Sequence, residues 1–198
     1  MGVQRNNIIL YSCAKMTDNT DRAAIIIYMQ NPACPTDMLI MLGVSKYCIN
    51  TIGGGKEHNE NDITCSIREC YEETRHLIDY RPAKDLLKRA RTFKYERCIY
   101  YLVQGNYNTM KVITDEFANT KIEDDPDGHT NEMQELRLVS IDNLIKQFVM
   151  QIYTDEKQRS YHNNFINMLM DIGYDQIKNN TCNFRTNCIN MTVRLNVS

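Results

Sequence analysis

The chain has 198 residues, of which 42% are hydrophobic and 24% are charged, and its formal net charge is −2. These values are ordinary for a globular protein with a buried core, and they leave little room for a second full domain. The near-neutral charge excludes a general electrostatic attraction to nucleic acid. Because no long apolar run and no signal-peptide pattern is present, we expect a cytoplasmic protein with no membrane partner and with reduced cysteines.

The first fifty residues predict β-strands. Residues 1–20 are polar apart from an apolar run at 8–11, which is typical of an edge strand or an arm. The runs at 23–29 and 38–42 are rich in β-forming residues and are separated by prolines, a pattern typical of a hairpin. Residues 47–52 then lead into three consecutive glycines.

Residues 54 to 76 read GGKEHNENDITCSIRECYEETRH, which contains the spacing G-x5-E-x7-R-E-x2-E-E. If 63–78 is a helix, its apolar positions form one stripe, and Glu69, Glu72 and Glu73 fall within roughly 100° of one another on the other side. Carboxylates gathered on one exposed spot repel each other, and hard divalent cations bind such oxygen clusters. This window therefore predicts a Mg²⁺ or Mn²⁺ site on a helix whose N-cap is Asn61 or Asp62. Taken alone, three acidic residues would more often be a solvated helix face.

The complete string of strand, glycines, polar loop and acidic helix resembles the Nudix box, the signature of hydrolases that cleave a diphosphate linked to a nucleoside. The resemblance is specific over residues 52–76 and general over about 22–152. It implies an α/β fold, a Nudix-type α/β/α sandwich with a mixed sheet. Arg75 stands where the family has glycine, and Ile52 stands where a proline is frequent. Without that glycine, we expect the helix to run on to about Ile78.

The resemblance also implies roles for individual residues. Metal ligands would be Glu69, Glu72, Glu73 and the carbonyl of Gly54. A water deprotonated by a glutamate such as Glu72 or Glu132 would attack one phosphorus, which makes Glu72, Glu69 and Glu132 the catalytic candidates. Glu60 and Arg68 would form an ion pair that orients the loop on the helix, and Glu57 is placed for a supporting or metal-binding role. As isolated residues, Glu57 and Glu132 could equally be surface charges.

The second half of the chain predicts further strands and helices. A buried strand is expected at 98–103, a loop at 121–131 and a strand at 133–140. One helix is expected at 141–152, capped by Ser140 or Asp142, and another around 161–172, stopped by Gly173. We expect a single domain over 1–178, with its core at about 22–152 and a C-terminal helix at about 157–172, followed by a tail at 179–198.

Substrate choice is less determined by the sequence. Seven basic residues lie between 81 and 97, and we take Lys88, Arg89, Arg91 and Tyr95 as substrate-binding candidates that could hold phosphates and stack a base. The alternative for this stretch is a solvated helix face beside an acidic site. The abundance of Asn, Ile, Met and Cys without Trp resembles Nudix proteins of large DNA viruses, which would place the protein in the host-cell cytoplasm.

Three functions follow from these observations. The first is a metal-dependent pyrophosphohydrolase acting on a small nucleoside diphosphate derivative of the ADP-ribose type. The second is a decapping enzyme that acts on the 5′ cap of RNA. The third is a Nudix-fold module that binds a nucleotide without cleaving it. It is suggested by Arg75, which stands where the family has glycine. Whether the protein forms a homodimer is left open.

Overall fold

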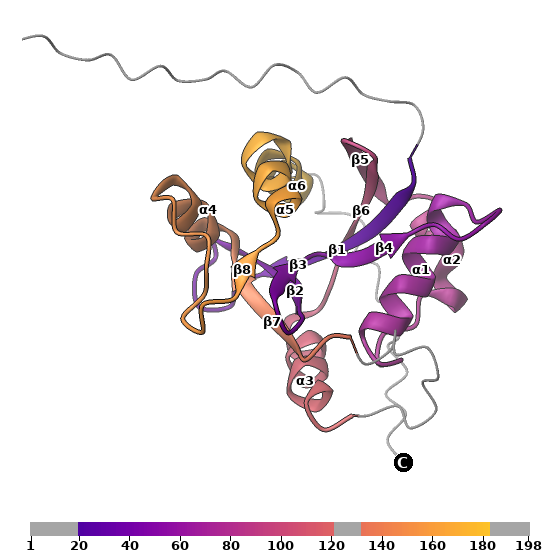
Figure 1. The fold of residues 1–198 in the computed structure, drawn as a ribbon, viewed down its shortest axis with the longest axis horizontal. Helices are drawn as coiled ribbons and strands as arrows, with labels where there is room; N and C mark the ends of the chain where they lie inside the picture. Colours follow the sequence, from indigo (N-terminus) through magenta and orange to yellow (C-terminus); the bar gives the residue numbers. More distant parts are fainter. Residues whose placement is uncertain (1–19, 121–131, 183–198) are drawn as a thin grey trace, which may run out of the picture.

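Strand β1 (Arg22–Gln30) lies at the centre of the sheet and is buried at each of its seven inner residues. Successive side chains of a strand point to opposite faces, so a strand that is buried on both faces needs a covering layer on each. The computed structural model, which describes residues 20–120 and 132–182, shows these two layers (Figure 1). β1 therefore explains why the chain folds as three layers.

The sheet is mixed and contains eight strands in the described residues. On one edge, β1 pairs in parallel with β6 (Cys98–Gln104), which in turn pairs with β5 (Arg91–Tyr95). On its other edge, β1 is antiparallel to β4 (Ile52–Gly55) over its first half and to β2 (Met38–Val44) over its second half. The remaining strands are β7 (Glu135–Ser140) and β3 (Cys48–Asn50), both of which pair with β2, and β8 (Ser160–Tyr161), which pairs with β3.

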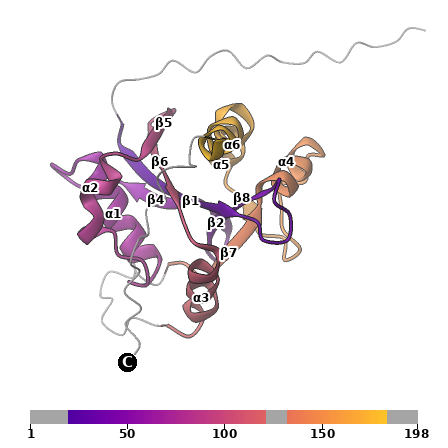
Figure 2. The ribbon, with the colours of Figure 1, turned by 180° about the vertical axis from the view of Figure 1, so that it is seen from behind.

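The two faces of β1 pack against different helices. Ala23, Ile25 and Ile27 belong to the core that contains α1 (Asp62–Glu73) and α3 (Tyr107–Phe117). Alternate residues, from Ala24 to Tyr28, belong to the core with α4 (Ile141–Val149), α5 (Asn163–Met168) and α6 (Tyr174–Cys182). The views from both sides show these helices on opposite sides of the sheet (Figures 1 and 2). The predicted α/β/α sandwich with a mixed sheet is confirmed.

Several predicted elements are confirmed, and one helix was not predicted. The hairpin of β1 and β2, the strands β6 and β7 and the helix α4, capped by Ser140, are all present. Sequence reasoning missed α3, although Met110, Ile113 and Phe117 lie on one helical face and Asn106 is a good N-cap. A short 3₁₀ turn (Arg81–Ala83) and α2 (Lys84–Leu87) follow α1 and lie beside it.

The predicted end of the C-terminal helix is wrong. Helix α5 begins at Asn163, after the capping residue His162, and the chain continues through a π-helical turn (Leu169–Gly173) into α6. Gly173 therefore does not stop the helix, because Ile177 extends the apolar face beyond it and is fully buried. Residues 179–182, predicted as tail, also belong to α6. The predicted arm at 8–11, the loop at 121–131 and the rest of the tail lie outside the described residues.

The sequence also predicts reduced cysteines and no membrane partner. The five cysteines described as free thiols include Cys65 and Cys70, which are buried in the core beneath α1. No helix in the described ranges is long and apolar enough to cross a membrane.

A buried ion-pair network fixes the turn before β8 to strand β7. The carboxylate of Asp155, whose side chain is 1% exposed, lies 2.7 Å from Arg159 and 3.0 Å from Arg137. Burial alone would raise the pKa of Asp155, but the hydrogen bonds from Arg159 and Arg137 lower it to about 2. Because the folded state holds the charged form, Asp155 stabilises the fold above its usual pKa of 3.8.

Asp155→Asn should lower the free energy of unfolding by about 2–3 kcal/mol at pH 7, because it removes the buried carboxylate shared by Arg137 and Arg159 and leaves both with the more exposed Glu135. The difference from wild type should shrink as the pH falls from about 4 to 2 and disappear below the folded-state pKa of about 2, where Asp155 is protonated in both states. Urea unfolding between pH 7 and 2.5 measures both effects. The control Glu156→Gln, at a side chain 73% exposed, should change stability by less than about 0.5 kcal/mol. A pH-independent loss for Asp155→Asn would contradict this account.

Candidate active site

The glycines of the motif form strand β4 rather than the predicted loop. Gly53 pairs with Ala24 and Gly54 with Ala23, and the loop begins only at Lys56. A Cβ atom on Gly53 would lie 2.4 Å from the Cα atom of Ala24. A Cβ atom on Gly54 would lie 2.4 Å from the carboxylate of Glu69. The bare main chain of β4 therefore lets helix α1 bring a carboxylate directly over the strand.

Helix α1 begins at Asp62 with Asn61 as its N-cap. The side-chain Oδ1 of Asn61 accepts a hydrogen bond from the N–H of Thr64 at 3.0 Å. Of the two predicted caps, Asn61 is therefore the right one. Asp62 instead accepts hydrogen bonds from Lys56 at 2.9 Å and from Thr20 at 2.6 Å, which fix the loop to the start of the helix.

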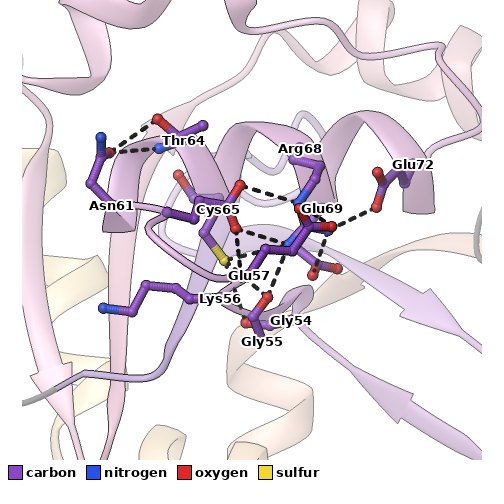
Figure 3. A network of polar contacts seen from close by, with 12 residues as sticks. Gly54, Gly55, Lys56, Glu57, Asn61, Thr64, Cys65, Arg68, Glu69 and Glu72 are labelled. Atoms are coloured by element: carbon purple, nitrogen blue, oxygen red, sulfur yellow. Dashed lines mark hydrogen bonds and ion pairs between the residues drawn. The ribbon is translucent and has the colours of Figure 1, made fainter.

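Arg68 is the centre of the polar network on α1 (Figure 3). Its guanidinium group donates to the carbonyl of Gly55 at 2.9 Å. It also lies close to four carboxylates, namely Glu60 at 3.0 Å, Glu69 at 3.0 Å, Glu72 at 2.9 Å and Glu57 at 3.6 Å. The ion pair expected between Glu60 and Arg68 is thus present. It connects the loop, the last glycine of β4 and the helix through a single side chain.

Glu73 does not lie on the exposed spot that the sequence predicts. Its residue is 7% exposed, and its Oε2 accepts a hydrogen bond from the N–H of Gly53 at 2.7 Å. The buried face of α1 is wider than the predicted stripe, because it includes Ser66, and Glu73 lies two turns further along this face. Burial raises the pKa of Glu73 well above its usual value, the Gly53 hydrogen bond opposes this, and the charges of Glu69 and Glu132 add to the rise.

The carboxylates of α1 have the right chemistry for a hard divalent cation. Burial raises the pKa of Glu69, Arg68 opposes this, and the charge of Glu72 adds to the rise. An oxygen-only donor set suits Mg²⁺ and Mn²⁺, and the missing side chain of Gly54 lets the Glu69 carboxylate lie against the main chain of β4. In the described residues, no three His, Cys, Asp or Glu side chains are arranged to hold an ion. With Arg68 now paired to Glu69 and Glu72, an ion would have to compete with this arginine.

The predicted continuation of α1 to Ile78 is wrong, because the helix ends at Glu73. Arg75 and His76 both adopt the left-handed conformation, with φ of 51° and 65°. The N–H of His76 closes the end by donating to the carbonyl of Tyr71 at 2.8 Å. Each non-glycine residue in this conformation costs about 1 kcal/mol or more.

Side-chain contacts offset this backbone cost. The guanidinium group of Arg75 donates to the carbonyls of Phe117 at 2.8 Å, Thr120 at 2.7 Å and Met133 at 2.6 Å. It also lies over the Phe117 ring, 4.1 Å from the centroid. Hydrogen bonds from a charged donor stabilise by about 1.5–3 kcal/mol each. Arginine can therefore hold the position where the family has glycine.

A cleft of about 530 Å³ adjoins the glycine strand at Gly53. Its lining includes two tyrosines, two arginines and two residues at the start of α5, namely Tyr95, Tyr100, Arg22, Arg97, His162 and Asn164. Tyr95 is the only predicted substrate-binding residue in this lining, and its hydroxyl donates to Asp171 at 2.8 Å. Sequence reasoning missed the others, because His162 and Asn164 lie far from the motif along the chain.

The other predicted substrate-binding residues do not line this cleft. Lys88 pairs with Asp85 at 2.7 Å, and both side chains are exposed. Arg89 is exposed, and Arg91 donates to Gln176 of α6 at 2.8 Å. The basic stretch is thus divided between α2, the turn that holds Lys88 and Arg89, and β5 at the sheet edge. It does not form one surface at the cleft.

Glu132 lies just before β7 and is exposed. The carbonyl of the next residue, Met133, accepts a hydrogen bond at 2.6 Å from Arg75, two residues after Glu73, and the charge of Glu132 adds to the rise in the pKa of Glu73 that burial causes. The structure therefore places Glu132 within electrostatic reach of the α1 carboxylates. Its role in catalysis stays a prediction.

Comparison with known proteins gives only distant likenesses. No family model matches the chain, and no curated protein matches its sequence. Among solved structures, a binary complex of the Ap4A hydrolase of C. elegans is 15% identical with a TM-score of 0.39, covering 64% of this chain and 84% of that one. The Nudix hydrolase RenU of M. smegmatis is 9% identical with a TM-score of 0.44, covering 79% and 86%. At these scores the likeness does not establish a family, so the functional assignment rests on the residues of the site.

Alanine substitutions in the glycine strand should have graded effects. Gly53→Ala should destabilise the protein by about 2 kcal/mol or more, because the added carbon would overlap the main chain of β1. Gly55→Ala is the matched control and should cost less than about 0.5 kcal/mol, because no described atom lies within 4 Å of its added carbon. Gly54→Ala should fall between them, since the flexible end of Glu69 can move away. Chemical unfolding of the three variants measures this order, and equal losses at Gly53 and Gly55 would contradict it.

Proposed function

We propose that this chain is a divalent-metal-dependent pyrophosphohydrolase of the Nudix type, acting on the diphosphate of a nucleoside diphosphate derivative. The observation that carries the proposal is the packing of α1 on the glycine strand. It puts the Glu69 carboxylate over Gly54 and the Glu73 carboxylate on the N–H of Gly53. Side chains on either glycine would prevent this arrangement, so glycines and carboxylates are needed together.

The residues that would hold Mg²⁺ or Mn²⁺ are Glu69, Glu72 and Glu73, with the carbonyl of Gly54. The ion would supply charge for the phosphate oxygens and lower the pKa of a water molecule. Glu72, whose side chain is 29% exposed against 15% for Glu69, is the better placed of the two to accept a proton from water as it attacks phosphorus. Glu132 is the alternative base.

Arg68 has a positioning role in this proposal. It balances the charge of Glu69 and Glu72, and its contacts with Glu60 and Gly55 would keep it in place when those carboxylates bind an ion. Glu57, which lies 3.6 Å from Arg68 and is 71% exposed, supports the same group from the loop. The products would be a nucleoside monophosphate and the phosphorylated remainder of the substrate.

The cleft favours a small substrate of the ADP-ribose type. Tyr95 and Tyr100 offer aromatic surface to a base, and Arg22 and Arg97 offer positive charge to a diphosphate. Arg22 lines the cleft and pairs with Gly55 of β4, so it lies beside the glycine strand on which the carboxylates pack. Lys88, Arg89 and Arg91 do not extend the cleft, which weighs against a long RNA track.

Glu72→Gln and Glu73→Gln should each lower the turnover number by at least about a hundredfold, because an amide cannot replace the carboxylate that each residue would offer to the ion. Both variants should remain folded by circular dichroism, and calorimetric titration should show weaker Mn²⁺ binding. The control Asp115→Asn, which breaks an exposed pair with Lys111 on α3, should retain both properties. Wild-type rates for both glutamine variants would refute the assignment of the metal site.

A substrate panel tests the preference for ADP-ribose. The protein should be incubated with ADP-ribose, dinucleoside polyphosphates and cap-labelled RNA, in Mn²⁺ and in Mg²⁺, with product identification. We expect AMP and ribose 5-phosphate from ADP-ribose at the highest rate. Release of m7GDP from RNA at a clearly higher rate would make the protein a decapping enzyme. In that case, alanine at Lys88, Arg89 and Arg91 should reduce mainly the RNA activity and increase its salt tolerance.

A nucleotide-binding module without catalysis is the second candidate. It is favoured by the pairing of Arg68 with Glu69 and Glu72, which would leave the site stable without an ion. Such a module would bind the panel nucleotides in calorimetry and release no monophosphate. Metal-dependent release from any substrate excludes it.

A further inference from the structure

Arg75 connects the end of α1 to two distant parts of the chain. Its side chain reaches the carbonyls of Phe117 and Thr120 at the end of α3, and the carbonyl of Met133 just before β7. Thr120 and Met133 flank the segment 121–131. Arg75 thus joins both sides of that segment to the helix that carries the candidate metal ligands.

The contacts are buried and use the fork of the guanidinium group. Arg75 is 9% exposed, and its Nη1 serves Phe117 and Thr120 while its Nη2 serves Met133. A lysine has a single terminal nitrogen and cannot reproduce this two-armed geometry. The arrangement also needs the left-handed backbone at Arg75, which turns the side chain away from the helix axis towards α3.

Met133 is the neighbour of Glu132 in the chain, and Arg75 is two residues from Glu73. Fixing the carbonyl of Met133 therefore fixes the main chain from which Glu132 extends. The adjoining N–H of Gln134 donates to the carbonyl of Val44 at 2.7 Å, so this short stretch is held from both sides.

We propose that Arg75 is a positioning residue, which holds Glu132 beside the carboxylates of α1 by clamping the carbonyl of Met133. The functional half of this inference rests on the proposed hydrolase activity, whereas the clamp itself does not. Arg75 would then do more than replace a glycine, because it would set the position of a glutamate that lies far from it along the chain.

Arg75→Gly tests the side-chain contacts separately from the backbone conformation. Glycine adopts the left-handed conformation freely, and the substitution removes every side-chain contact of Arg75. We expect the turnover number to fall at least tenfold with KM changed less than threefold. In a Glu132→Gln background, the same substitution should change turnover by less than twofold, because its effect acts through Glu132. Arg75→Lys should restore little. The control His76→Gly relieves the neighbouring left-handed residue without touching the clamp, and should keep turnover within twofold of wild type.

Hydrogen exchange gives a readout that does not depend on activity. Arg75→Gly should speed amide exchange in a peptide covering 132–136 at least tenfold and leave β5 and β6 unchanged. Unchanged exchange at 132–136 would refute the clamp. Wild-type turnover in Arg75→Gly, or an undiminished loss in the Glu132→Gln background, would refute the positioning role. If wild-type protein hydrolyses nothing in the panel, the proposed function fails, and exchange alone still decides on the clamp.

Discussion

The close approach of β4 to both β1 and α1 is the constraint on which the rest of the structure depends. At Gly53 the main chain of β1 leaves no space for a side chain, and at Gly54 the carboxylate of Glu69 takes that space. A helix normally packs on a sheet through apolar side chains. Here part of the contact is between the carboxylates of α1 and the main chain of β4. The N–H of Gly53 donates the hydrogen bond that the buried carboxylate of Glu73 requires. The site and the core are therefore parts of one packing arrangement.

One cation, Arg68, partly balances the negative charge on this surface. Arg68 contacts Glu57, Glu60, Glu69 and Glu72, so each carboxylate shares its counter-charge with three others. A planar guanidinium group can meet several carboxylates and a carbonyl at once, which a lysine cannot do. Burial raises the pKa of Glu69 and Glu73, and the negative charge of neighbouring carboxylates that Arg68 does not balance adds to the rise.

The sequence predicts the elements whose structure depends on local pattern. It does not predict those whose structure depends on contacts with residues far away in the chain. Alternation and β-forming residues suffice for β1, β2 and β6, and the motif spacing suffices for α1 and the Glu60–Arg68 pair. The end of α1 depends on carbonyls at Phe117, Thr120 and Met133, which the residues around 75 cannot reveal. Likewise, the helix does not stop at Gly173, because Ile177 beyond it is buried in the core. The cleft combines β1, β4, β6 and α5, so only the fold brings its residues together.

The parallel pairing of β1 with β6 has a consequence for how the chain reaches its native state. Arg22 of β1 pairs with Cys98 of β6, so the central strand cannot pair along this edge until β6 has been synthesised. Until then, one edge of its most apolar strand presents unpaired amide and carbonyl groups to other chains. Such long-range pairing is slow to form. The nascent protein is therefore most prone to aggregate while the ribosome is still translating the region between α1 and β6.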